Sequence, residues 1–504
     1  MTETLRHIRV LGRRSVVDTM RQPVMIFPAI FFPLAFLVVI AGGGDRASQI
    51  PGFPAESYFA IALAGAFIQG TMLSGVNSGS KLAFDIETGF LDRLVMTPVN
   101  SSAILVGHLV GSLAVSMLQL VVFLAAGLIG GVHIKSGLLG IPVMFVLALA
   151  VAVAFSAAGV IIGVRSGSAE KVQGVFPLFF IVMIFSSYMI PRPLMQADWF
   201  RWVATVNPAS YLIEGVRSLV VIGWDGGCDR GAHDRGSVGE PPAKGGVVVS
   251  EYVAAARAVM HRNLVAAIRL PALAIQPIVA PTVFLIAFGG GLSAFGDIPG
   301  FSFPSGYVSF QFAFIVLQAG LFNGVFLGVT LARDLELGFA HRLMLAMRHR
   351  SALIAGYVLA AVVRAVFVIA ALVGVGFLVG MRVDGSLLQM AGLLVFGILM
   401  SVIGALYASG IALRFKTIQA APVMFMPSFL ALFLTPLLVP FDLLTGWVKA
   451  VARYNPLTYM LNAGRGFISG LPNDTVLAFG LAAAAVAVAA LFAMRSLRRA
   501  EAGL

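Results

Sequence analysis

Residues 85–94 read DIETGFLDRL and residues 334–343 read DLELGFAHRL, so the pattern D-x-E-x-G-F-x-x-R-L occurs twice in the chain. Two further blocks repeat in the same order: an IPGF loop at residues 50–53 and 298–301, and an N-P-x-x-Y motif at residues 207–211 and 455–459. Three matched blocks in one order are hard to obtain by chance. They indicate that the chain is an internal duplication.

Long apolar runs separate these blocks. Of the 504 residues, 59% are hydrophobic and only 11% are charged, whereas soluble globular proteins carry about 25% charged residues. Each run is long enough to cross a hydrocarbon core of about 30 Å as a helix. Because lipid offers no partner to an exposed backbone, we expect an all-α polytopic membrane protein. The expected spans are residues 24–41, 58–79, 103–130, 138–163, 175–190, 271–291, 307–329, 352–380, 387–412, 421–439 and 476–494.

The duplication predicts two tandem transmembrane repeats, with about 11–12 spans in total. The predicted domains are a first repeat at residues 1–224, a polar Gly/Pro linker at 225–249 and a second repeat at 250–504. An apolar run follows Arg465, whereas a polar stretch follows Arg217, so the first repeat lacks a normal sixth span. Either residues 202–224 cross the membrane despite their charged side chains, or the first copy is damaged.

The basic residues indicate the orientation of the chain. Lys and Arg fall in the leader before each first span and in alternate loops, which the positive-inside rule places in the cytoplasm together with both termini. The net charge of +12 therefore reflects topology rather than a nucleic-acid ligand. The single cysteine, Cys228, excludes a disulfide within one chain, and the seven histidines show no metal-ligand spacing.

The repeated acidic segment is the first candidate functional site. We expect each copy to form a short amphipathic helix on the cytoplasmic side, with its acidic residues near the helix N-terminus, where the helix dipole favours anions. Such a helix could dock into a soluble partner, or it could be an ordinary interfacial helix tucked under the bundle. The residues concerned are Asp85, Glu87, Gly89 and Arg93, and in the second copy Asp334, Glu336, Gly338 and Arg342.

The second candidate site follows the fifth span of each repeat. Aromatic residues, prolines and isolated charges alternate there, which is typical of a re-entrant or interfacial hairpin on the outer face, broken at Asn-Pro. The hairpin could gate the outer mouth of a passage, or it could be an aromatic-belt anchor. Its key residues are Asn207, Pro208, Tyr211 and Arg217, matched by Asn455, Pro456, Tyr459 and Arg465.

The sequence also lacks the motifs of an energy-converting enzyme. It contains no G-x-x-x-x-G-K-[ST] loop to cradle ATP. Apart from His108 in the span at residues 103–130, the spans do not carry the Asp, Glu or His residues that proton-coupled carriers use. We therefore expect a transport subunit without catalytic residues, whose energy comes from elsewhere.

The chain resembles the type-2 ABC-transporter permeases, in the fused tandem-repeat form found beside daunorubicin- and tetronasin-type antibiotic exporters. The resemblance rests on the basic leader, on E-x-G-x-x-x-R-L before Thr97-Pro98, and on N-P-x-x-Y-x-x-x-x-x-R after span five. It implies that the Glu87 and Glu336 segments are coupling helices. They would dock onto two separate ATP-binding subunits, which would hold the ATP and Mg that this chain does not bind.

The resemblance further implies a place in the bacterial plasma membrane and export by alternating access. The substrate would be a hydrophobic or amphiphilic drug, antibiotic, lipid or glycolipid, and the hairpins would be extracellular. One departure is that Ala346-Met347 replaces Thr97-Pro98 in the second copy, so the two couplings are expected to be unequal. An ion-coupled secondary carrier also has two six-span repeats. That function, or a non-transporting membrane protein, remains the alternative.

Overall fold

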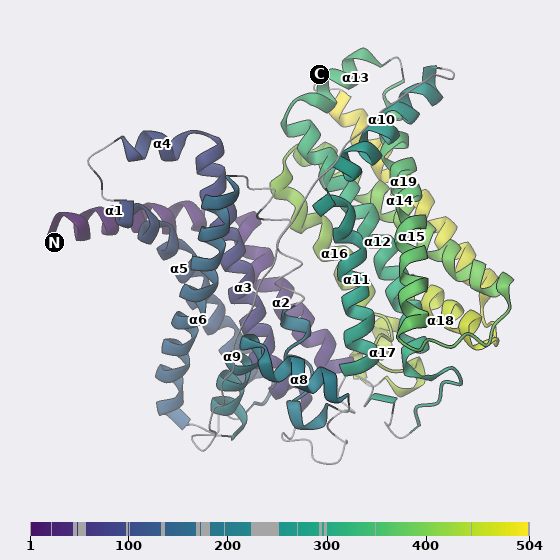
Figure 1. The fold of residues 1–504 in the computed structure, drawn as a ribbon, viewed down its shortest axis with the longest axis horizontal. Helices are drawn as coiled ribbons and strands as arrows, with labels where there is room; N and C mark the ends of the chain where they lie inside the picture. The colour runs from purple at the N-terminus through teal and green to yellow at the C-terminus, as the bar shows by residue number, and fades with distance from the viewer. Residues whose placement is uncertain are drawn as a thin grey trace. The chain divides into compact units, whose positions relative to one another are not determined.

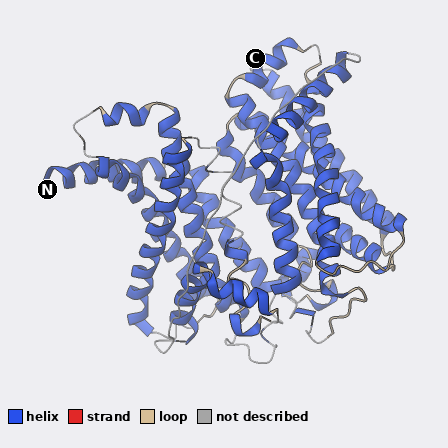
Figure 2. Cartoon of the chain, viewed as in Figure 1, coloured by secondary structure: helices blue, strands red, loops and turns tan. Residues whose placement is uncertain are grey.

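The computed structural model shows a chain built from α-helices, without strands in the described residues (Figures 1 and 2). The predicted all-α fold is therefore confirmed. The structure describes residues 2–21, 23–43, 48, 57–96, 99, 101–132, 137–167, 172, 182–195, 197–222, 251–269, 271–291, 295–296, 300–347, 349–444 and 446–501. The predicted linker 225–249, residues 175–181 of the fifth predicted span, and the Thr97-Pro98 pair lie outside these ranges.

The chain divides into two compact units, residues 1–232 and 233–504, and the division falls inside the predicted linker. In the first unit the helices are α1 (Thr2–Met20), α2 (Pro23–Gly43), α3 (Tyr58–Glu87), α4 (Phe90–Val95), α5 (Ser101–Ile129), α6 (Gly137–Ser166), α8 (Asp198–Val206) and α9 (Pro208–Arg217). A 3-10 turn, Arg192–Leu194, precedes α8, and a π turn, Ser218–Ile222, follows α9.

The second unit repeats this order and, within the described residues, has two more helices, one before the equivalent of α8 and one at its end. Its helices are α10 (Glu251–Arg269), α11 (Pro271–Gly291), α12 (Gly306–Glu336), α13 (Phe339–Ala346), α14 (Ser351–Leu378), α15 (Leu387–Phe415), α16 (Ala421–Phe433), α17 (Gly446–Tyr454), α18 (Pro456–Ser469) and α19 (Thr475–Glu501). The 3-10 turns are Ile418–Ala420 and Phe441–Leu443. Within each unit, α4 or α13 lies at one end of the bundle, here named the basic end. The pair α8–α9 or α17–α18 lies at the other, here named the hairpin end (Figure 1).

Apolar helices of membrane-spanning length occur in both units. By length and composition alone, the described residues contain seven: α3, Val106–Ile129 of α5, Gly140–Ser166 of α6, α12, α14, α15 and α19. Shorter apolar stretches lie at Ile30–Gly42, Pro277–Gly289 and Ala421–Phe433. Every predicted span except residues 175–190 thus coincides with an apolar helix. The prediction of two tandem helical membrane repeats is confirmed.

The central helix of each unit packs through small residues. On α12, glycines recur at every fourth position from Gly320 and face α15, where a Cβ on Gly324 would lie 2.1 Å from the carbonyl oxygen of Ser401. On α3, a Cβ on Gly79 would lie 2.1 Å from the carbonyl oxygen of Gly159 in α6. Such residues let helix backbones approach closely in lipid, where van der Waals packing holds helices together. A search for the G-x-x-x-G spacing would have found these contacts in the sequence.

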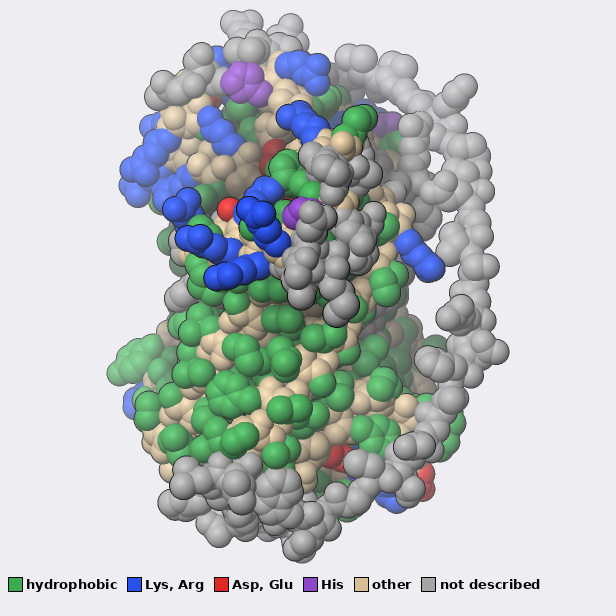
Figure 3. All heavy atoms as spheres, turned by 90° about the vertical axis from the view of Figure 1, so that its left-hand side faces the viewer, with side chains coloured by type: hydrophobic (Ala, Val, Ile, Leu, Met, Phe, Trp, Pro, Cys, Tyr) green, Lys and Arg blue, Asp and Glu red, His purple; other side chains and the backbone are tan. Residues whose placement is uncertain are grey.

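The outer surface of the first unit is apolar along α5 and α6. Val121, Val146 and Ile161 are each more than half exposed. On this face Figure 3 shows a belt of hydrophobic side chains, with Lys and Arg gathered towards one end. A belt of this kind is stable only against lipid, so the exposed faces of these helices form the lipid-contacting surface.

Residues 202–224 do not form one helix that crosses the membrane. α8 ends at Val206, and α9 begins at Pro208, whose ring leaves no backbone N–H to continue the preceding helix. The crossing predicted for residues 202–224 stays a prediction, and residues 223 and 224 lie outside the described ranges. The second unit has the same break but continues past Gly470 into α19, for which the described part of the first unit has no counterpart.

The fifth span of the second unit is shorter than its apolar run. The run predicts a helix over residues 421–439, but α16 ends at Phe433, and the chain then continues irregularly through Pro436 and Leu437. Proline cannot donate a helical hydrogen bond. The carbonyls after Phe433 therefore need donors from elsewhere in the unit.

Candidate functional site

The repeated acidic residues lie at the end of a long helix. Glu87 is the last residue of α3, and Glu336 is the last residue of α12. Gly89 and Gly338 follow with φ angles of 65° and 71°, which glycine adopts without strain, and each ends its helix before the next one begins. The prediction that these acidic residues begin the short helix is wrong, because the glycine separates them from it.

In the second unit a buried network ties the basic end together. Asp334, only 3% exposed, accepts two hydrogen bonds from the guanidinium of Arg262, at 2.7 and 2.6 Å, and a third from the hydroxyl of Tyr357. The Arg262 guanidinium also lies 3.9 Å from the centre of the Phe339 ring. Its hydrogen bond with Asp334 raises the pKa of Arg262 above the ordinary value, so the guanidinium stays protonated. Helices α10, α12, α13 and α14 are thereby linked.

In the first unit the residues at the equivalent positions have different partners. Arg14 lies 4.2 Å from the centre of the Phe90 ring, as Arg262 does on Phe339, but its ion pair is with Asp18 in its own helix. Asp85 instead has a contact of 3.5 Å with His108. Arg14, Asp18, Asp85 and His108 all line a small pocket there, where the second unit has a closed network.

Both short helices present exposed side chains at the basic end. Arg93 of α4 and Arg342 of α13 are exposed, and Leu337, just before α13, is 64% exposed. Glu336 is exposed as well, and its carboxylate accepts hydrogen bonds from the Thr417 hydroxyl and the Ile418 amide at 3.0 and 2.9 Å. Such a surface can dock a partner, and the glycine turn connects it directly to the central helix.

At the hairpin end, the predicted asparagines cap helices. The amide of Ala209 donates to the Asn207 side-chain oxygen at 2.9 Å, and the amide of Leu457 donates to that of Asn455 at 3.0 Å. The asparagine side-chain nitrogens donate back to the preceding segment, at Val182 and Phe185 in the first unit and at Ala431 in the second. Each asparagine therefore begins one helix and holds the end of another.

Proline and tyrosine complete each hairpin. Pro208 and Pro456 occupy the first position of α9 and α18, where a missing N–H costs nothing. The hydroxyl of Tyr211 donates to the carbonyl of Thr205 at 2.7 Å. That of Tyr459 donates to the carbonyl of Arg453 at 2.9 Å. The short helices α8 and α17 are thus fastened to α9 and α18.

The predicted arginines supply the donors that the irregular fifth segments need. Arg465 is 5% exposed and donates to the carbonyls of Pro436, Leu437 and Phe310 at 2.7, 3.2 and 3.2 Å. Its guanidinium also lies 3.4 Å from the centre of the Phe310 ring. Unpaired carbonyls are costly inside a membrane, so this arginine allows the backbone to leave the helix there.

Arg217 plays the same part in the first unit. It is 4% exposed and donates to the carbonyls of Ser187, Tyr188 and Ile61 at 2.7, 3.3 and 3.3 Å. These acceptors lie at positions equivalent to those of Arg465. The repeated N-P-x-x-Y-x-x-x-x-x-R motif therefore describes one hydrogen-bonded construction, built twice.

Two functional positions of the hairpin end were not assigned from the sequence. The hydroxyl of Tyr58 donates to the carbonyl of Met189 at 2.9 Å, and that of Tyr307 donates to Leu438 at 3.3 Å. Each tyrosine closes one copy of the repeated IPGF loop block. The sequence shows that the tyrosine is repeated, but it does not show the distant carbonyl that accepts the hydrogen bond of each hydroxyl.

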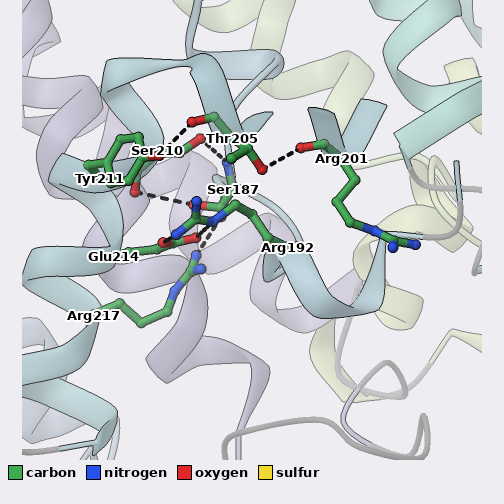
Figure 4. A network of polar contacts seen from close by, with 8 residues as sticks. All are labelled: Ser187, Arg192, Arg201, Thr205, Ser210, Tyr211, Glu214 and Arg217. Carbon is green, nitrogen blue, oxygen red and sulfur yellow. Dashed lines mark hydrogen bonds and ion pairs between the residues drawn. The ribbon is translucent and has the colours of Figure 1, made fainter. Parts of the chain in front are cut away.

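One cluster belongs to the first hairpin alone. Arg192 forms a bidentate ion pair with Glu214, with its Nε donating at 2.7 Å, and lies 4.9 Å from the centre of the Tyr211 ring. In Figure 4 these three residues meet beside Ser187, whose carbonyl accepts from Arg217. The equivalent positions of the second hairpin hold Phe441 and Asn462, and there Lys449 lies 5.6 Å from the centre of the Phe441 ring.

Comparison with known proteins gives the same two-fold division. The model of the family described as "ABC-2 type transporter" matches residues 6–221 and again residues 254–468. The chain belongs to the ABC-2 type transporter family. This permease is therefore a multi-pass membrane transport subunit, and the resemblance read from its repeated motifs is confirmed.

Two relatives are permeases named for drug resistance. The daunorubicin resistance ABC transporter permease protein DrrB1 of Streptomyces coeruleorubidus is 28% identical over 271 residues, which cover 52% of this chain and 90% of the relative. The probable doxorubicin resistance ABC transporter permease protein DrrC of Mycobacterium tuberculosis is 23% identical over 158 residues, 31% of this chain and 57% of the relative. In the described ranges, no group of His, Cys, Asp or Glu residues could hold a metal ion.

Proposed function

We propose that this ABC-2 permease is the membrane half of an ATP-driven exporter of hydrophobic or amphiphilic molecules such as drugs, antibiotics, lipids or glycolipids. Two copies of a separate ATP-binding subunit would dock at the basic end and hold the ATP and Mg. The observation that carries the proposal is the pair of exposed short helices, α4 and α13, each joined through one glycine to a long central helix. The names of the two drug-resistance relatives support the substrate class.

The same proposal fixes an orientation. In the first unit Lys and Arg gather at the basic end (Figure 3), and in each unit the leader helix (α1 or α10) and the short helix (α4 or α13) carry arginines. The positive-inside rule favours a cytoplasmic position for the basic end of each unit in a bacterial plasma membrane. Both termini would then be cytoplasmic, and the hairpins would lie on the outer side.

In the second unit, one rigid helix connects the docking surface to the hairpin. α12 carries Asp334 at the basic end, and Phe310, whose carbonyl and ring both contact Arg465, at the hairpin end. The separation of 24 positions from Phe310 to Asp334 corresponds to about 36 Å along an α-helix. A force on α13 would be transmitted to α12 through the contact between Arg262 and Phe339. Helix α12 would then move as a rigid body and displace the hairpin.

Co-purification with an ATP-binding-cassette subunit tests this function. Substitution of both Arg93→Ala and Arg342→Ala removes one exposed charge from each short helix, and we expect it to lower recovery of the subunit and ATP-dependent drug export together. Glu87→Ala with Glu336→Ala should act in the same direction. Asp198→Ala is the matched control, because its side chain is 93% exposed at the hairpin end and should leave both measurements unchanged.

Two results would overturn the proposal. One is an ATP-binding subunit that still co-purifies when all four exposed charges, Glu87, Arg93, Glu336 and Arg342, have been replaced. The other is export by the purified permease alone in vesicles under a proton gradient, which would identify an ion-coupled carrier.

A further inference from the structure

Helix α6 of the first unit and α15 of the second occupy equivalent places in the two repeats. Residues 85 and 334, which begin the repeated acidic segments, are 249 positions apart, and so are Arg165 near the end of α6 and Arg414 near the end of α15. The packing against the central helix agrees, so the two helices can be compared position by position. The matched contacts are Gly79 with Gly159 and Gly328 with Ala408.

In the second unit, helix α19 runs along one side of α15. Near the start of both helices the Phe396 ring stacks on the Phe479 ring, with centroids 4.3 Å apart. Near the end of both, Nε of Arg414 donates to the Ser496 hydroxyl oxygen at 3.0 Å. The two helices are therefore parallel, and Arg414 at the basic end has a hydroxyl of α19 as its acceptor.

The side of α15 that α19 covers is a stripe of residues three or four positions apart, as one face of a helix requires. Between the two ends, Tyr407 stacks on Phe492 with ring centroids 6.2 Å apart, and a Cβ on Gly410 would lie 2.4 Å from the same ring. The stripe consists of Phe396, Leu399, Ile403, Tyr407, Gly410 and Arg414.

No helix in the described part of the first unit runs along the matching side of α6. Ile161, which matches the buried Gly410, is 53% exposed, and Ala150 and Ala154 are exposed as well. Residues 223–250, which come next in the chain after the first unit's last described turn, are rich in charged residues and glycine, so they offer no apolar helix to cover it. This side is here named the open face: Leu147, Ala150, Ala154, Ala158, Ile161 and Arg165.

Small side chains give the open face the shape of a helix-packing surface. Ala150, Ala154 and Ala158 recur at every fourth position, and all three are at least partly exposed. In lipid, small residues at this spacing let a second helix backbone approach closely, and van der Waals packing then holds the two together. The matching positions of α15 carry the larger Leu399, Ile403 and Tyr407. A helix can therefore lie closer to α6 than α19 lies to α15.

The charge at the end of the open face indicates which helix fits. Arg165 is exposed at the basic end, where Arg414 of the second unit donates to Ser496 of α19. Two copies of α6 that faced each other about an axis along the membrane normal would bring two guanidinium groups together, and their repulsion disfavours that pairing. A helix of a different protein can instead bring an acceptor to Arg165, either a hydroxyl or a carboxylate near its end.

We propose that the open face of α6 binds a membrane-spanning helix of a second protein. This helix runs parallel to α6, packs small residues at four-residue spacing against the three alanines, and brings a hydroxyl or carboxylate to Arg165. In the isolated chain lipid contacts the open face, and the partner helix displaces that lipid. The binding requires neither ATP nor a transported substrate, so it stands or falls separately from the export function.

A peptide with the sequence of α19 is a suitable probe, because it carries alanines at four-residue spacing and a serine near its end. Its Ala493→Cys form is mixed in phosphatidylcholine vesicles with the full-length permease carrying Cys228→Ser and Ile161→Cys. In the second unit a Cβ on Gly410 would lie 3.4 Å from the Cα of Ala493, so the matched cysteines lie within reach of a disulfide. Under mild oxidation we expect a permease band that is heavier by one peptide.

Three matched variants show whether the peptide sits on the open face. Val106→Cys replaces Ile161→Cys at a side chain that is 39% exposed and equally far from the basic end of its helix, and it should give about tenfold less cross-linked product. Ala154→Leu, added to the Ile161→Cys protein, fills the open face and should lower the yield about fivefold. Ala125→Leu, at an exposed alanine of α5, should leave the yield unchanged.

The proposal fails on any of three results. A yield at Val106→Cys equal to that at Ile161→Cys would mean random collision in the membrane. A yield unchanged by Ala154→Leu, or no cross-linked product at all, would mean that the open face contacts only lipid. A disulfide that joins two permease chains through Ile161→Cys would mean that a second copy covers the face.

Discussion

The two repeats build the hairpin end alike and the basic end differently. Arg217 and Arg465 donate to carbonyls at equivalent positions, whereas the equivalent aspartates at the other end have different partners. Asp334 is held by a guanidinium and a phenol. Asp85 contacts an imidazole nitrogen of His108 at 3.5 Å, beside a small pocket.

The difference follows from what each place requires. A broken helix in lipid leaves carbonyls that water cannot reach, so a buried donor is needed in both copies. At the basic end of the first unit, Arg14 and Asp18 are 47% and 37% exposed, so these polar groups can also pair with water, and the cost of a different partner is small there. The two repeats can therefore differ at the basic end while the hydrogen-bonded hairpin stays the same.

The largest expected effect concerns the shared hairpin. Arg465→Gln leaves the carbonyls of Pro436, Leu437 and Phe310 without their donor and should cost about 3 kcal/mol of stability. Arg217→Gln should cost less, because its Nε and Nη1 have no hydrogen-bond partner within the described residues. The fraction of monodisperse protein that remains after heating in detergent measures both. Arg453→Gln, at an exposed side chain, is the control, and equal losses at Arg217 and Arg465 would contradict this ranking.

A smaller effect should separate the two aspartates. Asp334→Asn weakens the pairing with Arg262 in a buried site and should cost about 2 kcal/mol, whereas Asp85→Asn should cost less than about 1 kcal/mol. Thermal unfolding of the purified permease compares them. Tyr357→Phe removes only a hydroxyl and should fall between the two. A loss at Asp85 as large as that at Asp334 would show that the first basic end is equally fixed.

The smallest effect is expected at the ion pair found in the first hairpin. Glu214→Asn introduces the residue of the second repeat and should destabilise α9 locally by about 0.5 kcal/mol, since both partners are a quarter exposed. Hydrogen exchange in α9 would then rise about twofold. The reciprocal change, Phe441→Arg with Asn462→Glu, should slow exchange in α18. If neither helix responds, the ion pair does not distinguish the hairpins.

Local chemistry explains which features were predictable. The apolar runs predicted the spans. The Asn-Pro pair predicted the break between α8 and α9, because the missing N–H of proline and the capping side chain of asparagine act on adjacent residues. The end of α16 at Phe433 was missed, because an apolar run continues to residue 439 whether or not the helix does. The acidic residues were placed in the wrong helix because the glycine turn after them was overlooked.

The sequence by itself determined that this protein is a duplicated helical membrane permease, since hydropathy, charge placement and repeated motifs are properties of neighbouring residues. Only the tertiary structure decided what each buried polar group binds. Arg465 and its acceptor Phe310 are 155 residues apart in the chain. Asp334 and Arg262 are 72 residues apart. Helix packing alone brings such groups into contact, and in lipid a buried donor or acceptor without a partner inside the protein costs free energy.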